Sequence, residues 1–334
     1  MTGTPAAFWE AAGEQIRCTL CPHLCRLAEG QAGLCGVRQV VDGQLTTRAD
    51  GWLVAAHATP IETKPFYHFA PGGRAFSFGA PGCTMSCSFC QNWQVSQLPK
   101  GGGGPPPVAR SPEALVAAAV ESGCVALAAT FTEPTLLAEY WLRLAPLAAA
   151  AGLALLWKTN GFTSPAVVAA LSPHLAGVNI DLKAWAPARW QALGAAREPV
   201  LAATAAYAAA GLHVELTTVF DPQQWADERE FAGLSAWILE HLGPDVPWHL
   251  NRWHPDYLAA DGVPVNAETL RAGREAARAA GHRYVYTDAD EAGRTTLCPA
   301  CGAAVLRRGE RGVLEDRRRG GRCVCGQALP IVAA

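Results

Sequence analysis

The stretch "AFSFGAPGCTMSCSFCQNWQ", residues 75–94, joins a short apolar run to three closely spaced cysteines. Cys83, Cys87 and Cys90 follow the pattern C-x3-C-x2-C on one tight loop. Thiolates at this spacing can hold three irons of a [4Fe–4S] cube, whereas ferredoxin-type clusters use four thiolates. The remaining iron would be open to a small molecule, as the open position of a catalytic zinc site is. Phe89, beside Cys90, is placed to cover an aromatic ligand.

Two simpler interpretations of the three cysteines are a zinc site and a set of buried thiols. Structural zinc prefers a closed tetrahedral set of four ligands, and no fourth cysteine lies near this loop. A loop directly after a strand is also an unusual place for inert core cysteines. The pattern therefore favours an iron–sulfur centre with an open iron.

Composition predicts a cytoplasmic globular protein. The chain has 334 residues, of which 50% are hydrophobic, and a net charge of −2. This length allows one large domain with small appendages, and the small net charge argues against nucleic acid or an anionic membrane as partner. The N-terminal segment lacks the pattern of a secretion signal. The alanine-rich apolar runs are interrupted by Pro146 and Gly152, so we expect buried elements and no membrane span.

Short apolar runs alternate with longer alanine-rich runs between residues 75 and 288. Strands are expected at 75–80, 124–130, 153–159, 176–182, 213–220, 247–253 and 283–288. Helices are expected at 111–123, 133–152, 164–171, 187–211, 227–243 and 266–281, and a glycine-rich loop at 100–112. Such alternation is typical of parallel sheets with right-handed crossovers. The predicted fold is α/β: a partial (β/α)6 TIM-like barrel at 73–290, an N-terminal cysteine-rich module at 1–72 and a zinc-ribbon-like segment at 291–334.

Polar residues follow the predicted strands at their C-terminal ends, where sites gather in such folds. Thr132 and Glu133 follow the second strand, and Thr159 and Asn160 close the third. Asp181 and Lys183 close the fourth strand, and His249 and Asn251 lie in the sixth. We expect these side chains to surround the cysteine loop.

The cysteine loop, followed by an alternating α/β chain, resembles the radical S-adenosylmethionine (SAM) superfamily. The resemblance implies a [4Fe–4S] cluster whose open iron binds SAM, and an oxidoreductase that cleaves SAM to a 5′-deoxyadenosyl radical. That radical would take a hydrogen atom from the substrate, while the protein supplies orientation and exclusion of side reactions.

Shorter motifs resemble the activating-enzyme-like branch of this superfamily. "NIDLKA" implies Asp181 and Lys183 beside SAM, and "PWHL" implies His249 as a neighbour of the ribose or adenine. "TFTEPT" implies Thr132 and Glu133 at the methionine amino group, and "KTNGF" resembles the third-strand turn that carries Asn160. Lys158 stands where glycyl-radical activases have an acidic residue.

Across residues 15–330 the chain resembles the AmmeMemoRadiSam system radical SAM enzymes. The resemblance is carried by "CTLCPHLCRLAEGQAGLCGVR", "PIETKPFYHFAPG", "GAPGCTMSCSFCQNWQVSQ", "FTEPT", "NIDLKA", "HLNRWHPDY" and "YVYTDAD". It implies an unidentified substrate of that system, the system's two companion proteins as partners, and an electron donor of flavodoxin or ferredoxin type. The alternative activity is activation of a glycyl-radical enzyme.

Two further cysteine groups flank the predicted barrel. Cys18, Cys21, Cys25 and Cys35 fit a closed zinc site, with an auxiliary iron–sulfur cluster as the alternative. Cys298, Cys301, Cys323 and Cys325 resemble a zinc ribbon whose second knuckle is one residue short, which should strain the site. Cys124 stands alone and is expected to be a buried strand cysteine. If all three groups were structural, the protein would be a zinc-dependent scaffold.

Overall fold

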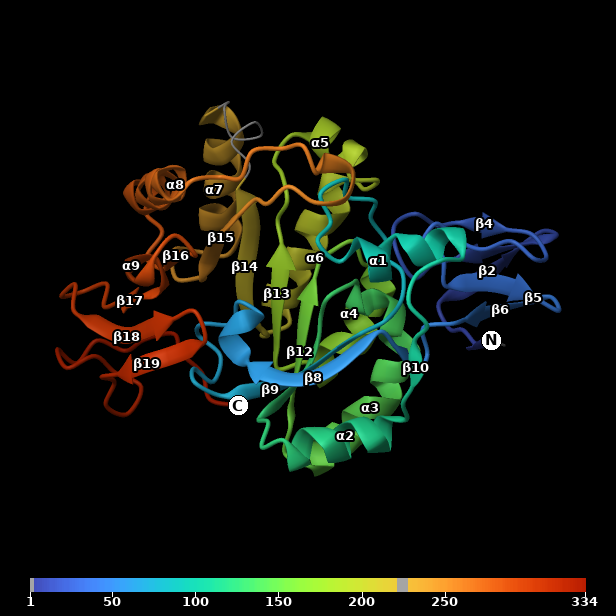
Figure 1. Ribbon diagram of the computed structural model, residues 1–334, viewed down its shortest axis with the longest axis horizontal. Coiled ribbons are helices and arrows are strands. Elements are labelled where there is room, and N and C mark those ends of the chain that lie inside the picture. The colour runs from blue at the N-terminus through green and yellow to red at the C-terminus, as the bar shows by residue number, and fades with distance from the viewer. Residues whose placement is uncertain (1–2, 221–227) are drawn as a thin grey trace.

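An eight-stranded sheet forms the centre of the computed structural model, which describes residues 3–220 and 228–334 (Figure 1). Its strands are β8 (Ala55–Pro60), β9 (Arg74–Gly79), β11 (Ala126–Ala129), β12 (Ala154–Thr159), β13 (Gly177–Asp181), β14 (His213–Phe220), β15 (Trp248–Arg252) and β16 (Val285–Thr287). All seven predicted strands are present, with their ends within two residues of the expected ones.

The strand order β16-β15-β14-β13-β12-β11-β9-β8 follows the order of the chain. The strands from β9 to β16 are parallel, and β8 pairs antiparallel with β9. Because every crossover runs in the same direction with the same hand, the crossover helices lie on one face of the sheet. The α/β fold is thereby confirmed. In the described part of the chain β8 and β16 form the two edges of the sheet, so the pairing does not show a closed barrel.

The crossover helices begin and end as local sequence signals predict. They are α2 (Pro112–Glu121), α3 (Ala138–Ala150), α4 (Pro165–Leu171), α5 (Pro187–Ala192), α6 (Arg197–Ala209), α7 (Glu228–His241) and α8 (Ala267–Ala280). Ser111 caps α2 by accepting from the backbone N–H of Ala114 at 3.2 Å. The expected helix 187–211 is divided into α5 and α6, because Gly194 between them has a φ of 71°. Asp227, the first residue of another expected helix, lies outside the described residues.

The N-terminal segment forms two small antiparallel sheets. One contains β2 (Trp9–Ala12), β3 (Gln15–Cys18) and β4 (Arg26–Leu27). The other contains β1 (Thr4–Pro5), β6 (Gln44–Thr47) and β5 (Arg38–Val41). The expected loop at 100–112 holds β10 (Val108–Ala109), which pairs with β7 (Trp52–Leu53). After the cysteine loop, α1 (Trp93–Ser96) and the 3-10 turn η2 (Leu98–Gly101) return the chain to the N-terminal sheets.

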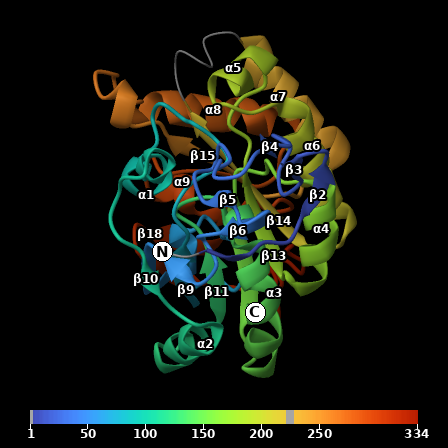
Figure 2. The same cartoon turned by 90° about the vertical axis from the view of Figure 1, so that its right-hand side faces the viewer.

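A C-terminal sheet lies at the opposite end of the molecule from the N-terminal sheets (Figures 1 and 2). It follows α9 (Glu291–Arg294) and contains β17 (Thr296–Leu297), β18 (Ala304–Gly309) and β19 (Gly312–Asp316). The buried Arg308 attaches this sheet to the segment before β9, since its Nη2 donates to the Tyr67 carbonyl at 2.6 Å. Among the described helices, none is long and apolar enough to cross a membrane.

Candidate active site

The cysteine loop begins where β9 ends, at Gly79. Backbone N–H of Met85 and Nδ2 of Asn160 approach Cys83 Sγ at 3.4 and 3.6 Å, and Ser96 Oγ lies 3.2 Å from Cys90 Sγ. Burial raises the pKa of Cys83 to about 12 and also raises that of Cys87. Buried thiols with raised pKa values and polar donors around their sulfurs suit ligation of a positively charged metal centre, which would stabilise the thiolate form.

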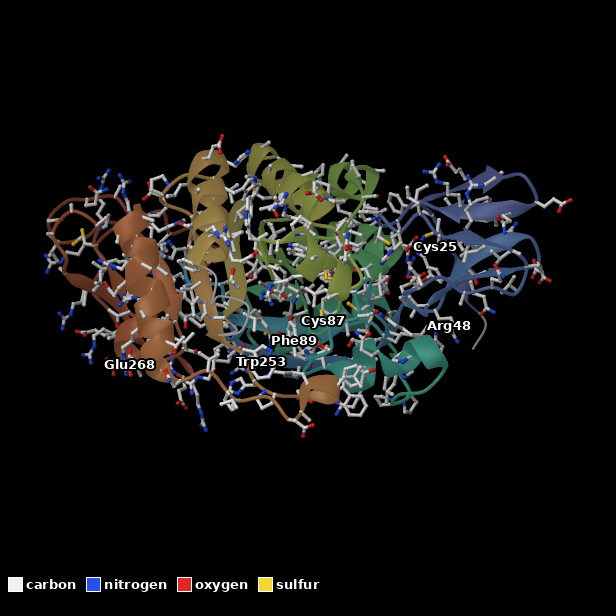
Figure 3. The ribbon with its side chains drawn as sticks, turned by 90° about the horizontal axis from the view of Figure 1, so that it is seen from above. Cys25, Arg48, Cys87, Phe89, Trp253 and Glu268 are labelled. Carbon is white, nitrogen blue, oxygen red and sulfur yellow. The ribbon has the colours of Figure 1, made fainter. Side chains whose placement is uncertain are left out.

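A cavity of about 370 Å³ opens beside this loop at the C-terminal edge of the sheet. It is lined by all three cysteines of the loop and by five of the seven predicted cofactor-binding residues: Phe89, Thr132, Asn160, Asp181 and Lys183. Cys87 and Phe89 lie together near the middle of the molecule, with Trp253 beside them (Figure 3). The rings of Phe89 and Trp253 meet edge to face at a centroid distance of 6.4 Å. The structure therefore combines an open thiol set with a cavity large enough for a small ligand.

An ion-paired group forms one wall of the cavity. Asp181 pairs with Lys158 and, at 2.8 Å, with Lys183. Lys158 Nζ also donates to Asn179 Oδ1 at 2.8 Å, and Thr217 Oγ1 donates to the same oxygen at 2.7 Å. Burial alone would raise the pKa of Asp181, but the two ammonium groups lower it to about 2. The carboxylate therefore stays charged and fixed at the cavity surface.

The two other predicted residues, Glu133 and His249, do not line this cavity. Glu133 is fully buried and accepts from Thr135 N, Thr135 Oγ1, Thr159 Oγ1 and Asn160 N at 2.7–3.0 Å. It thereby holds the turn that presents Asn160 to Cys83. His249 Nε2 lies 2.7 Å from Glu215 Oε2, and His249 lines an adjoining second cavity. Direct contact of Glu133 or His249 with SAM stays a prediction.

Lys64 and Lys100 are two lysines at this site that the sequence motifs did not indicate. The chain has four lysines in all, namely Lys64, Lys100, Lys158 and Lys183. Three of them line the cavity, and Lys100 donates to the Met85 carbonyl at 2.7 Å from behind the cysteine loop. Nearly all other basic side chains of the protein are arginines, so its lysines are concentrated in this region. That compositional contrast was visible in the sequence.

Phe131 is a further cavity residue that the sequence did not indicate. It has a φ of 70°, in the left-handed region that a bulky residue rarely adopts. Lys64 Nζ lies 4.7 Å from the centre of its ring. Backbone strain of this kind is maintained only where the surrounding structure imposes it, and it is common at functional sites.

We expect Lys64 to react with an amine reagent at unusually low pH. Its side chain is buried, and burial lowers its pKa to about 8, so the neutral amine predominates above that pH. The rate of labelling at Lys64, followed by mass spectrometry of its peptide, should rise with a midpoint near pH 8. Lys183 is the internal control, because Asp181 and nearby thiols raise its pKa against the effect of burial. Equal profiles for the two lysines would contradict this assignment.

A second cavity, of about 450 Å³, adjoins the first and shares with it Thr63, Pro65, Asn251, Arg252 and His254. Several buried polar atoms of its lining residues lack a hydrogen-bond partner within the described residues. These atoms are Glu62 Oε2, Arg252 Nε, Thr287 Oγ1 and Asp288 Oδ1. Buried polar groups normally find partners, so this set of donors and acceptors is suited to a polar ligand.

The C-terminal cysteines form a compact metal-binding geometry. Cys298, Cys301, Cys323 and Cys325 bring four sulfurs within 4.8 Å of one another. Cys298 Sγ lies 3.6 Å from Cys325 Sγ, and Cys301 Sγ lies 3.7 Å from Cys323 Sγ. A Zn–S bond of about 2.3 Å implies edges of about 3.8 Å in a tetrahedron of sulfurs. The shorter second knuckle therefore does not keep the four thiols apart.

Removing one of these thiols should release one zinc ion per chain. We expect Cys323→Ser to lose the zinc that the wild type binds, because three thiolates leave the tetrahedron open. Metal analysis of the purified proteins measures this, with Cys124→Ser as the matched control for loss of a buried thiol. If Cys323→Ser kept the wild-type zinc content, the four C-terminal cysteines would bind no zinc.

Comparison with known proteins identifies a family domain within the chain. The family model for the Radical SAM superfamily matches residues 78–233, which include the cysteine loop and the strand ends around the cavity. The chain contains a Radical SAM superfamily domain at residues 78–233. This domain makes the protein an enzyme of a class that uses SAM and an iron–sulfur cluster, and the three thiols and the adjoining cavity described above fit both groups.

Relatives resemble this radical SAM enzyme to different extents. The uncharacterized protein MJ0808 of Methanocaldococcus jannaschii is 31% identical over 98% of this chain and 99% of its own. Streptococcus suis SuiB, solved with bound S-adenosylmethionine, is 12% identical with a TM-score of 0.48, over 63% of this chain and 48% of that one. A domain of a pyruvate-formate lyase-activating enzyme from Bacteroides vulgatus is 14% identical with a TM-score of 0.42, over 48% of this chain and 98% of that one. The chain thus spans about half the length of SuiB.

Proposed function

We propose that this radical SAM enzyme belongs to the AmmeMemoRadiSam system and abstracts a hydrogen atom from a polar substrate of that system. The observation that carries the activity is the position of Cys83, Cys87 and Cys90. Their loop follows β9 directly and borders the 370 Å³ cavity. Three thiols leave one iron of a [4Fe–4S] cluster without a protein ligand.

The residues around the cavity would hold SAM in one orientation. When bound, the cluster supplies the electron that splits the SAM sulfonium into methionine and a 5′-deoxyadenosyl radical. Asp181, kept charged by its two lysines, would accept from polar hydrogens of SAM, while Lys183 would donate to an oxygen. Phe89 would cover the adenine, and Asn160 would keep the Cys83 thiolate oriented through its Nδ2. Thr132 lines the same cavity.

We place the substrate in the second cavity. It shares lining residues with the first, so a radical formed beside the cysteine loop would face it. Its unpartnered atoms include two carboxylate oxygens, one guanidinium N–H and one hydroxyl. A ligand that satisfies them presents both hydrogen-bond donors and acceptors. The substrate class is therefore a polar small molecule or a polar segment of a protein.

The motif "PIETKPFYHFAPG" supports the finer assignment. It is one of the stretches in which the chain resembles the AmmeMemoRadiSam enzymes. Residues of it that line one or both cavities are Glu62, Thr63, Lys64, Pro65 and Tyr67. Glu215 holds this segment in place, since its carboxylate accepts from Tyr67 N and His68 N at 3.0 and 2.8 Å. The motif thus lies where specificity for a substrate would be decided.

The proposal is tested by adding candidate partners to anaerobic, reduced protein with SAM and a flavodoxin as electron donor. We expect the two companion proteins of the system to raise the rate of 5′-deoxyadenosine formation by about tenfold or more. A glycyl-radical enzyme is the comparison, with its radical followed by electron paramagnetic resonance. Stimulation by that enzyme alone, with a glycyl signal, would replace this proposal by the activase alternative.

A further inference from the structure

We propose that Cys18, Cys21, Cys25 and Cys35 bind a second iron–sulfur cluster rather than zinc, and that this cluster passes the electron to the catalytic cysteine loop. The inference rests on the proposed function, because it assigns a role beside the radical centre. It concerns thiols that the reaction at the first cavity does not use.

The four cysteines lie at the end of β3 and in the connections that lead from it to β4 and β5. Cys18 ends β3, Cys25 precedes β4, and the backbone N–H of Cys18 donates to the Cys25 carbonyl at 2.9 Å. Cys18, Cys21 and Cys35 are buried, and Cys25 is partly exposed. Cys18, Cys25 and Cys35 are near enough to Cys21 for their charges to act on it. Buried thiols at this density suit shared ligation of a metal centre.

Donors surround the sulfurs of this group. The backbone N–H groups of Val37 and Arg38 donate to the sulfur of Cys35. Arg38 Nη1 lies 3.8 Å from Cys18 Sγ, and the guanidinium is fixed by its buried ion pair with Glu139. Hydrogen bonds to sulfur and a nearby cation favour thiolates and set the potential of an iron–sulfur centre.

The spacing of the sulfurs distinguishes a cluster from zinc. Among the described residues, the C-terminal quartet is the one group of three or more ligand atoms that lie within 4.8 Å of one another. The sulfurs of the N-terminal quartet do not have that compact arrangement, and neither do the three sulfurs of the cysteine loop. Around a single zinc ion all sulfurs share one centre, whereas in a [4Fe–4S] cube each thiolate binds a different iron. The N-terminal quartet and the cysteine loop therefore both lack the compact arrangement of the C-terminal quartet.

The N-terminal quartet directly touches the catalytic loop. A Cβ on Gly82 would lie only 2.3 Å from the Cys35 carbonyl oxygen, so the backbones on either side are in contact. His23, between Cys21 and Cys25, has its Nε2 2.7 Å from the Thr84 carbonyl. Gly82 and Thr84 are the two neighbours of Cys83. Two short routes, one through backbone contact and one through a hydrogen bond, therefore join the two sets of thiols.

Lys100 lies between the two groups. Its Nζ donates to the Met85 carbonyl and to Ser86 Oγ, at 2.7 and 3.0 Å. On the side of the N-terminal quartet, Gly36, next to Cys35, packs against Lys100, since a Cβ on Gly36 would lie 2.6 Å from Lys100 Cα. A cation in this position would reduce the repulsion between two anionic clusters.

The electron balance of the relay is simple. A one-electron donor of flavodoxin or ferredoxin type reduces the N-terminal cluster, which then reduces the catalytic cluster and returns to its oxidised state. No bond forms or breaks in these two transfers, and no proton moves. The electron is consumed when the carbon–sulfur bond of SAM is cleaved.

Metal analysis and Mössbauer spectroscopy of the full chain, reconstituted without oxygen, test the binding claim. The decisive variant is Cys83→Ala/Cys87→Ala/Cys90→Ala, which leaves the N-terminal module unaltered. We expect about eight irons per chain in the wild type, about four in this variant, and one zinc in both. A colourless triple variant with two zinc ions overturns the proposal, and the zinc of the ribbon reports that the protein is folded.

A second experiment tests the relay and separates its failure from failure of the proposed function. In Cys18→Ser/Cys25→Ser, we expect 5′-deoxyadenosine formation with reduced flavodoxin to fall by at least about tenfold, and dithionite to restore it by reducing the catalytic cluster directly. Unchanged turnover with flavodoxin overturns the relay. Because the iron content of the triple variant does not depend on SAM cleavage, the second cluster is tested even if the enzyme makes no 5′-deoxyadenosine.

Discussion

Replacing Cys87 by alanine should lower 5′-deoxyadenosine formation by more than about 100-fold. Loss of a partner that merely orients a ligand costs 10- to 100-fold in metal affinity or activity, and loss of a ligand itself should cost more. Cys87 lies between Cys83 and Cys90 and lines the cavity, so two thiols alone would have to hold the cluster. The product is measured by chromatography after anaerobic incubation with SAM and dithionite.

Cys124→Ala is the matched control for this experiment. Cys124 is also a buried free thiol, but it precedes β11 and belongs to none of the three cysteine groups. The control protein should keep wild-type turnover. Equal losses of activity in both variants would mean that removing a buried thiol harms the fold. Full activity of Cys87→Ala would show that the cysteine loop takes no part in the reaction.

Asp181→Leu should lower the free energy of unfolding by about 3–5 kcal/mol, because breaking a buried pair leaves charge without compensation. Here two mostly buried ammonium groups, those of Lys158 and Lys183, lose their shared carboxylate. Urea unfolding at pH 7 measures the effect. Because the lysines hold the pKa of Asp181 at about 2, against an ordinary 3.8, its contribution is complete above about pH 4 and is lost as the pH falls towards 2.

Two further variants show whether this effect comes from the charges. Lys158→Met/Asp181→Leu leaves one ammonium group in place of two, so it should be more stable than Asp181→Leu alone. Asp261→Leu, at an exposed position, should change the free energy of unfolding by less than about 0.5 kcal/mol. If the double variant were no more stable than Asp181→Leu, the stabilisation would come from packing and the ion-pair account would be wrong.

The sequence predicted the sheet well because its strands are buried on both faces. Continuous apolar runs such as that of β12 mark strands of a parallel sheet. The antiparallel edge strand β8, "AAHATP", carries no such pattern, since most of its residues are only partly buried. Its place depends on pairing with β9, which no local signal encodes. The break between α5 and α6 was likewise hidden within an alanine-rich run.

The predicted site residues line the cavity where they follow directly from strand ends. Asp181 ends β13 and reaches the cavity, as does Asn160 one residue after β12. Glu133 is turned inward, where it accepts from Thr135, Thr159 and Asn160, and these tertiary contacts are not encoded in a local sequence pattern. His249 lines only the second cavity, whereas Asn251 and Arg252, further along β15, line both cavities.

The most direct test of the central claim is the electron paramagnetic resonance spectrum of the reduced protein before and after addition of SAM. The proposal predicts a [4Fe–4S]⁺ signal whose g values shift when SAM binds the open iron, and no SAM-dependent shift in Cys87→Ala. A reduced signal that SAM leaves unchanged in the wild type would contradict an open iron at the cysteine loop. A protein that binds only zinc and gives no iron–sulfur signal would contradict the account as a whole.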